Sequence, residues 1–159
     1  MSVDAVSVVS WPADAAGGGT YLLWLRPRRF DAVAIGRLGT MTPRPGYYGY
    51  VGSAMGPGGV AARVGRHLRR EKPQRWHLDY LRPFCDVVAI WYVVSGRRVE
   101  HRWVAALAAM PGAMPAMTGF GASDHPGATH LFHFGSMPPL DHFAARAGGG
   151  RIRCLRPSD

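Results

Sequence analysis

The stretch GYYGYVGSAMGPGGVAARVGRHLRR, Gly46 to Arg70, decides the fold, because a strand pattern passes through a glycine-rich loop into a helix pattern. Residues 47–51 predict a strand rich in tyrosine. Side chains alternate along a strand, so Tyr48 and Tyr50 share one face and Tyr47 points to the other. The loop lacks the lysine followed by serine or threonine that a P-loop requires, which excludes a nucleoside triphosphate site of that kind and predicts no nucleotide cofactor.

The helix pattern begins at Gly59 and runs to Arg70, before Pro73. Its apolar residues recur every fourth position and predict a buried stripe of Val60, Val64 and Leu68. Beside that stripe, Arg63, His67 and Arg70 lie at positions i, i+4 and i+7. We therefore expect these basic side chains to border a cleft.

The rest of the chain predicts further strands and helices and no internal repeat. Strand patterns occupy residues 20–25, 30–39, 85–94 and 129–134. Helical patterns occupy residues 74–83, residues 97–110 and a short segment after Pro138. In the helix at 97–110, the buried face is expected to hold Val99, Trp103 and Leu107. The sequence therefore predicts an α/β protein.

Length and charge point to one basic domain. The chain has 159 residues, 47% of them hydrophobic, which suits a single compact core. Nineteen residues are Lys or Arg, of which only Lys72 is lysine, and ten are acidic, for a formal charge of +9. This balance favours a polyanionic partner, nucleic acid above all. Alternatively, the arginine excess reflects genome base composition, and the charge serves solubility.

The two cysteines and the hydropathy pattern predict a protein of the cytoplasm. Cys85 and Cys154 are too few for a disulfide framework and too far apart for a zinc knuckle. Residues 1–10 lack the pattern of a signal peptide, and no apolar stretch is long enough to cross a bilayer. We therefore expect no membrane partner.

Four features in order resemble the GIY-YIG nuclease superfamily. They are the segment GTYLLWL at residues 19–25, the tripeptide YVG at residues 50–52, an arginine eleven residues later, and a glutamate opening a later helix. The resemblance extends from Gly19 to about Ala108. The remainder, with GFGASD and THLFHF, is similar to a small standalone prokaryotic branch of unknown function that is sometimes linked by name to endonuclease III.

This resemblance implies a small GIY-YIG-type domain over residues 17–146, with a central, mostly antiparallel β-sheet flanked by helices and a C-terminal extension. Residues 19–108 would carry the motifs. Residues 1–16 would form an N-terminal segment, and residues 147–159 a basic C-terminal tail.

Hydrolysis of a phosphodiester requires a positioned water, a proton acceptor and positive charge near phosphorus. The fork of Arg63 suits the scissile phosphate, although a solvated helix arginine is the simpler alternative. The resemblance implies that Glu100 holds a single divalent cation, Mg²⁺ or Mn²⁺. A carboxylate in a first helical turn also has a purely structural explanation, since it interacts favourably with the helix dipole.

The resemblance implies a tyrosine of the two tripeptides as proton acceptor, assisted by a histidine. Tyr21 and Tyr50 are the candidate pair and His67 the helper, while the neighbouring tyrosines at 47 and 48 are expected to pack or line a groove. A tyrosine is a weak base at neutral pH unless positive neighbours lower its pKa. Protonation of His67 near its ordinary pKa predicts that activity falls below about pH 6.5.

Other residues are candidates for contacts to nucleic acid. They are Arg66, Arg70, His77, Arg151 and Arg153, with Arg156 nearby in the tail. His77 could equally be a satisfied core histidine. Asp124, His125 and His130 suggest zinc, but the resemblance implies that relatives often carry cysteines at 125 and 127, and Gly127 removes one such ligand.

Three functions follow from these patterns. The first is a metal-dependent endonuclease that hydrolyses phosphodiester bonds in DNA, in repair or processing, with structured or damaged DNA as a candidate substrate. The alternative is a nucleic-acid-binding module with the same fold and little or no cleavage. A partner-binding role rests only on the apolar segment at residues 110–117. Tyr21, Tyr50, Arg63, His67 and Glu100 together favour the enzyme, whereas Ser53, where many relatives have lysine, argues for slow cleavage.

Overall fold

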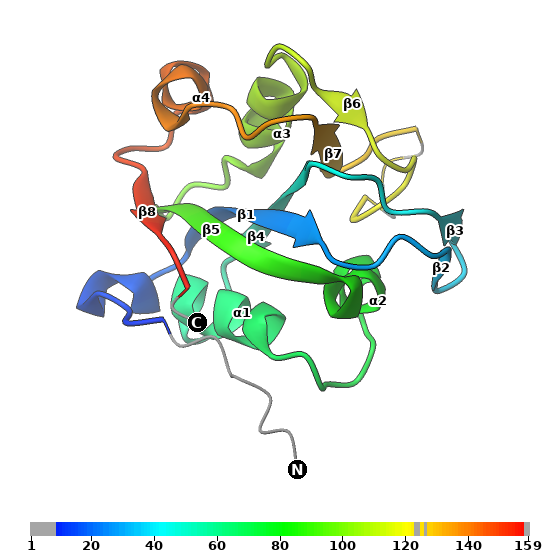
Figure 1. Ribbon diagram of the computed structural model, residues 1–159. Helices are drawn as coiled ribbons and strands as arrows, with labels where there is room; N and C mark the ends of the chain where they lie inside the picture. Colours follow the sequence, from blue (N-terminus) through cyan, green and yellow to red (C-terminus); the bar gives the residue numbers. More distant parts are fainter. Residues whose placement is uncertain (1–8, 123–124, 126, 158–159) are drawn as a thin grey trace.

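The computed structural model describes residues 9–122, 125 and 127–157 (Figure 1). Their strands are β1 (Gly19–Pro27), β2 (Val33–Ile35), β3 (Gly39–Met41), β4 (Tyr47–Ala54), β5 (Cys85–Val94), β6 (Met114–Pro115), β7 (Leu131–Phe134) and β8 (Arg153–Leu155). Their helices are α1 (Gly59–Leu68), α2 (His77–Leu81), α3 (Glu100–Ala108) and α4 (Leu140–Ala147), with short 3₁₀ turns η1 (Ala13–Ala16) and η2 (Arg82–Phe84).

Six strands form an antiparallel sheet in the order β6-β7-β4-β1-β5-β8, so the predicted α/β class with a central antiparallel sheet is confirmed. Helices α1 and α2 lie on one side of the sheet, and α3 and α4 on the other (Figure 1). The middle strand, β1, is almost wholly buried because both of its faces are covered. None of the described helices is long and apolar enough to cross a membrane.

The structure confirms that side chains at residues 47–51 alternate between the two faces of the sheet. Tyr48 and Tyr50 belong to the core under α1, whereas Tyr47 packs against the core on the other side. The apolar stripes predicted for the two helices are also buried. They consist of Val60, Val64 and Leu68 on α1, and of Val99 just before α3 with Trp103 and Leu107 on it.

Two parts of the fold differ from the sequence-based expectation. Residues 30–39 do not form one strand, because the chain reverses at Gly36, whose φ of +51° favours glycine, and β2 pairs with β3 as a separate hairpin. The basic tail contributes strand β8, which pairs with β5. Arg153 of β8 also forms an ion pair with Asp14 of η1 at 2.9 Å, so both end segments pack onto the domain.

Candidate active site

A buried hydrogen bond between β1 and α1 forms the centre of the candidate site. Tyr21 Oη and His67 Nε2 lie 2.8 Å apart, and each residue is only 1% exposed. Tyr50 of β4 completes the group, because its ring centroid is 6.1 Å from that of His67. The structure therefore brings together the two tyrosines and the histidine that the sequence singles out.

The glycine of the YVG tripeptide makes room for this group. Gly52 lies opposite Tyr21 in the β1–β4 pair. A Cβ atom at Gly52 would come within 2.3 Å of the Tyr21 hydroxyl oxygen, far inside van der Waals contact. Any side chain there would displace Tyr21, so glycine is required by the packing of the tyrosine rather than by its own backbone angles.

The two tyrosines are protonated in the metal-free site. Burial raises the pKa of Tyr21 well above its ordinary value, and the nearby Tyr50 adds to this effect. Burial also raises the pKa of Tyr50, followed by the negative charge of Glu100. The positive charge of Arg63 opposes both shifts.

His67 is neutral throughout the physiological pH range. Burial lowers its pKa to about 3, and the positive charge of Lys72 acts in the same direction. The expectation that protonation of His67 reduces activity below about pH 6.5 is therefore wrong for this structure. The physical reason is that the ring is enclosed between α1 and the sheet, where water cannot solvate an imidazolium ion.

Arg63 and Arg66, three residues apart on α1, hold their guanidinium groups over the ring of Trp76. The two Cζ atoms lie 4.4 Å and 4.1 Å from the ring centroid, within the range of cation–π attraction. Arg66 forms an ion pair with Asp79, but Arg63 forms none with any carboxylate that the structure describes. Arg63 is therefore the guanidinium that remains available to bind an anion beside the tyrosines.

Asp79 holds Trp76 and Arg66 in place. Its buried carboxylate accepts hydrogen bonds from both terminal nitrogens of Arg66, at 2.9 Å and 3.0 Å, and from the backbone N–H groups of Arg75 and Trp76, at 2.8 Å and 3.0 Å. Burial alone would raise the pKa of Asp79, but these hydrogen bonds hold it below its ordinary value. Arg66, a predicted nucleic-acid contact, thus already has an intramolecular partner.

Glu100 opens α3, on the side of the sheet opposite α1. The β4–β7 register ends at Tyr50, and at the next position of β4 the Val51 N–H donates to the His130 carbonyl at 3.1 Å. His130 Nδ1 donates to the Val51 carbonyl at 3.1 Å and lies 3.8 Å from Glu100 Oε1. The negative charge of Glu100 also raises the pKa of both Tyr21 and Tyr50.

The donor set at Glu100 suits a hard cation that keeps most of its water. Mg²⁺ commonly binds through one or two carboxylates together with water and phosphate oxygens. The side chain of Glu100 is 32% exposed, so its oxygens are open to such a partner. Within the described ranges, no three His, Cys, Asp or Glu side chains come together as a metal cage. A single carboxylate ligand therefore fits magnesium or manganese better than zinc.

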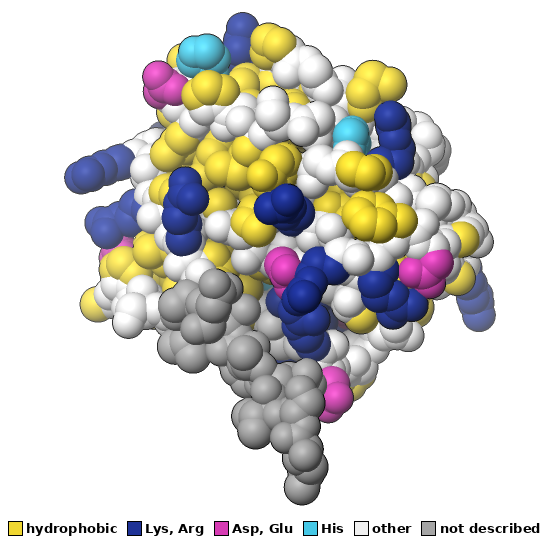
Figure 2. All heavy atoms as spheres, viewed as in Figure 1, with side chains coloured by type: hydrophobic (Ala, Val, Ile, Leu, Met, Phe, Trp, Pro, Cys, Tyr) yellow, Lys and Arg dark blue, Asp and Glu magenta, His cyan; other side chains and the backbone are white. Residues whose placement is uncertain are grey.

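The other predicted nucleic-acid contacts do not gather at this site. Arg70 pairs with Asp86 at 2.7 Å, and Arg153 pairs with Asp14 on the β8 edge. Arg151 is exposed near that same edge. Figure 2 likewise shows basic side chains scattered over one face, with acidic ones among them. The structure offers no continuous basic band on the face that this figure draws.

His77 and the zinc candidates His125 and His130 have different surroundings. His77 Nδ1 accepts a hydrogen bond from the Gly121 N–H at 2.8 Å, and its ring packs against Phe120, which supports its reading as a satisfied histidine. His130 belongs with Glu100, and His125 is exposed. Asp124 lies outside the described residues, so the zinc hypothesis remains untested there.

Sequence reasoning missed Trp76 as a residue that shapes the site. It considered Asp79, with His77 and Tyr80, for a contact to nucleic acid, for orienting the helix or as part of a core segment, but did not predict that Asp79 pairs with Arg66. The available signal was the spacing of Trp76 and Asp79, since an acidic residue three positions after a helix N-cap typically forms a capping box. The structure shows this arrangement at the start of α2. What the spacing does not predict is that α2 docks beside α1, which brings the Trp76 ring to Arg63.

A protein-family model described as "Domain of unknown function DUF123" matches residues 20–150. This range includes Tyr21, Tyr50, Arg63, His67 and Glu100 and ends before β8. No curated protein and no solved structure matches the chain.

Proposed function

We propose that this chain, which belongs to the DUF123 family, is a metal-dependent endonuclease related to the GIY-YIG nucleases and hydrolyses phosphodiester bonds in DNA. One observation carries the proposal. The guanidinium of Arg63 has no ion-pair partner among the described carboxylates and is held over Trp76, whose ring centroid lies 5.6 Å from that of His67, the hydrogen-bond partner of Tyr21. An oriented cation of this kind suits an anionic ester better than a neutral substrate.

Arg63 binds the scissile phosphate. Its planar fork can donate two parallel hydrogen bonds to phosphate oxygens, and the Trp76 ring limits the orientations that the fork adopts. Because these donors are already in place, they can stabilise the charge that develops on phosphorus without much rearrangement.

His67 orients Tyr21 for proton transfer. Nδ1 of His67 has no partner, and buried N–H groups without an acceptor are rarer than buried acceptors without a donor. This favours the tautomer with its proton on Nε2, which donates to the Tyr21 oxygen. That hydrogen bond stabilises the phenolate, as does the nearby Arg63. Once its own proton has passed to solvent, Tyr21 takes a proton from the water that attacks phosphorus, and the bond from phosphorus to the leaving oxygen breaks.

Glu100 would hold Mg²⁺ or Mn²⁺ at the start of α3. A cation bound there would neutralise charge on the phosphate and the leaving oxygen. Tyr50 packs against His67, and its hydroxyl would order the attacking water. The negative charge of Glu100 raises the pKa of both tyrosines, so screening of this carboxylate makes their ionisation easier.

A nucleic-acid-binding module without efficient cleavage is the second candidate. The raised pKa of both tyrosines favours it, since neither is ready to accept a proton in the metal-free site. Ser53 favours it as well, because its buried hydroxyl has no partner in the structure and supplies no positive charge. Such a module would bind DNA through Arg63 and leave it intact.

The deciding experiment is a cleavage screen. Single-stranded, nicked, branched and duplex DNA, and matched RNA, are incubated with the protein and Mg²⁺ or Mn²⁺, with Arg63→Ala as the matched control. The endonuclease proposal expects products from the wild type that the variant does not form. Binding to these substrates without products under any condition would favour the binding module, and equal cleavage by both proteins would indicate a contaminant or a different site.

A further inference from the structure

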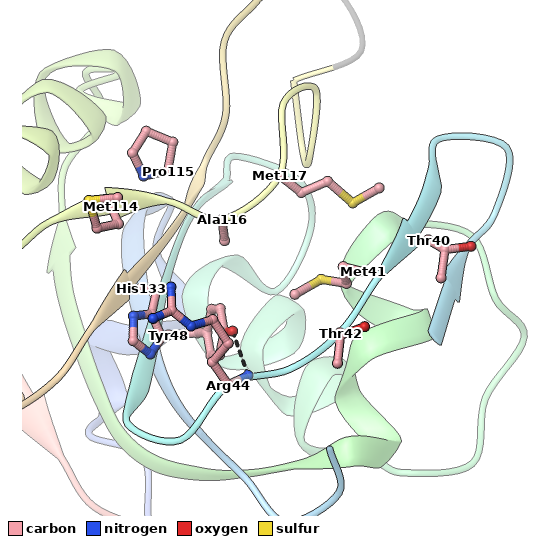
Figure 3. Close-up of a pocket in the computed structure, with 10 residues that line it drawn as sticks. All are labelled: Thr40, Met41, Thr42, Arg44, Tyr48, Met114, Pro115, Ala116, Met117 and His133. Carbon is pink, nitrogen blue, oxygen red and sulfur yellow. Dashed lines mark hydrogen bonds between the residues drawn. The ribbon is translucent and has the colours of Figure 1, made fainter. Parts of the chain in front are cut away.

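A pocket lies on the same side of the sheet as the candidate active site (Figure 3). Its volume is about 200 Å³. Residues 40–42 at the β3 end of the hairpin border it on one side and the segment 114–117 covers another. Tyr48 and His133 lie at its base in the view of Figure 3, and the exposed Arg44 lies beside them. None of the residues in this lining has a role in the hydrolysis proposed above.

Strand β4 links this pocket to the active site. Tyr48 in the pocket and Tyr50 in the site are two positions apart on one face of the strand, about 7 Å along it. The ring of Phe120 packs against Tyr50, with centroids 5.9 Å apart. A nucleotide chain that follows β4 would need to extend by only about one unit to pass from the Tyr50 end of this face to the pocket.

The lining of the pocket combines apolar and polar side chains. Met41, Met114 and Met117 contribute flexible thioether side chains, which adapt to flat ligands. The side chain of Met114 is 57% exposed and therefore accessible to a ligand. Thr40 and Thr42 add hydroxyl groups that can donate or accept hydrogen bonds.

The base of the pocket is rigid, and one cation at its rim is available. Arg44 donates its backbone N–H to Tyr48 Oη at 2.9 Å, and His133 Nε2 donates to the Pro45 carbonyl at 2.8 Å. These bonds fix the loop before β4. The guanidinium of Arg44 forms no ion pair with a described carboxylate, and the residue is exposed. It is placed to contact a phosphate at the mouth of the pocket.

We propose that this pocket holds one unstacked nucleobase of the DNA strand whose scissile phosphate lies at Arg63, with Arg44 on the adjoining phosphate. The inference rests on the proposed function. The volume of the pocket is below the roughly 300–1,000 Å³ of sites for drug-sized ligands, so a single planar ring fits better than a larger molecule. Apolar side chains together with hydroxyl groups match the way proteins hold a base taken out of the stack.

This arrangement defines the preferred substrate. A base in a continuous duplex must unstack and unpair before it can enter the pocket, at a cost of a few kcal/mol. A base that is single-stranded, mismatched or at a branch has already lost those contacts. The protein is therefore expected to prefer DNA with an unpaired nucleotide beside the cleaved bond.

Methyl NMR of the methionines tests the pocket directly. The chain has seven methionines, and Met110 and Met137 pack on the other side of the sheet as internal controls. The probe is a 5′-phosphorylated thymidine trinucleotide without divalent cation, compared with the same trinucleotide lacking its bases. A bound ring shifts nearby methyl signals, so the intact probe should shift the pocket methionines Met41, Met114 and Met117, and the base-free probe should not.

The indole signal of Trp76, assigned with Trp76→Phe, reports separately on the active site. If the intact probe moves this signal but leaves the three pocket methionines unchanged, the base pocket is refuted while the proposed function is untouched. If neither signal responds to any oligonucleotide, the protein does not bind DNA and both proposals fail.

A filling variant provides the second measurement. Ala116→Phe keeps the backbone hydrogen bond from residue 116 to the Leu131 carbonyl and occupies the pocket. Its control is Ala144→Phe, exposed on α4. We expect the ratio of affinities for single-stranded and duplex DNA to fall at least about tenfold in Ala116→Phe. The control should keep the wild-type ratio. An unchanged preference in a correctly folded Ala116→Phe protein overturns the inference.

Discussion

Tyr21 and His67, 46 residues apart in sequence, share a buried hydrogen bond of 2.8 Å that joins the middle strand of the sheet to α1. The bond can form because Gly52, on the neighbouring strand, leaves space for the Tyr21 ring. Burial of the pair keeps the histidine neutral and the tyrosine protonated at neutral pH. The buried pair therefore affects both the stability of the fold and the proposed chemistry.

The first prediction concerns stability at acid pH. The pKa of His67 is about 3 in the folded protein and about 6.5 when unfolded, so below pH 6.5 only the unfolded chain takes up this proton. Stability is therefore fully present above pH 6.5 and falls by up to about 1.4 kcal/mol per pH unit toward pH 3. His67→Gln should flatten this slope in urea unfolding between pH 4 and 7.5. His142→Gln, exposed on α4, is the control, and equal slopes for all three proteins would contradict the prediction.

The second prediction concerns the ring that supports Arg63. Trp76→Ala removes a cation–π contact worth about 0.5–2 kcal/mol, so cleavage by the proposed enzyme should fall by about two- to thirtyfold. Trp76→Phe keeps an aromatic face and should retain more activity. Single-turnover rates and DNA affinity, measured on protein whose unfolding curve has been checked, give the comparison. If the alanine variant cuts as fast as the wild type, Trp76 does not position Arg63.

The third prediction concerns the ion pair behind that ring. Asp79→Asn leaves the guanidinium of Arg66 without its charge partner, and breaking a buried pair typically costs about 3–5 kcal/mol. Asp86→Asn breaks the more exposed pair with Arg70 and should cost at most about 1 kcal/mol. Urea unfolding at neutral pH measures both. Similar losses for the two variants would show that the Asp79 pair contributes no more than a surface pair.

The fourth prediction concerns the salt dependence of DNA binding. Each phosphate that a basic side chain neutralises contributes about −0.9 to the slope of log affinity against log salt concentration on duplex DNA. Arg63→Ala should reduce the slope by about one contact, whereas Arg70→Ala should change it less because Asp86 already neutralises that side chain. Binding is measured on a nonspecific duplex without divalent cation. A flat slope for the wild type would remove nucleic acid from the partners of this protein.

Much of the fold could be predicted, because its main elements carry local patterns. The two-residue alternation at 47–51 and the four-residue repeat of Val60, Val64 and Leu68 each describe one buried face. Strand β8 could not be predicted in this way. It is only three residues long, and its existence depends on pairing with β5, about sixty residues earlier. The hairpin at residues 33–41 was interpreted as one strand although Gly36 marked a turn.

The candidate site could likewise be predicted only where local patterns determine it. Tyr21, Tyr50 and His67 come together because alternation on strands and spacing on α1 place them on facing surfaces. The neutral state of His67 depends on how deeply three elements enclose it, which no local pattern records. Glu100 is similar, since its position 3.8 Å from His130 depends on the docking of α3 beside the segment that leads into β7.

The last prediction separates binding from cleavage at Glu100. Glu100→Gln keeps the size of the side chain and removes the charge that would hold a divalent cation, while Arg63 and Trp76 are unchanged. DNA affinity without metal should stay level or rise slightly, because one negative charge near the phosphates is gone. Cleavage should fall at least about a hundredfold, as on loss of a major electrostatic contributor. Rates are measured across a magnesium titration, with His101→Gln, exposed one position later on α3, as the control. If Glu100→Gln cuts nearly as fast as the wild type with the same magnesium response, the carboxylate only stabilises the start of α3, and the metal must bind elsewhere.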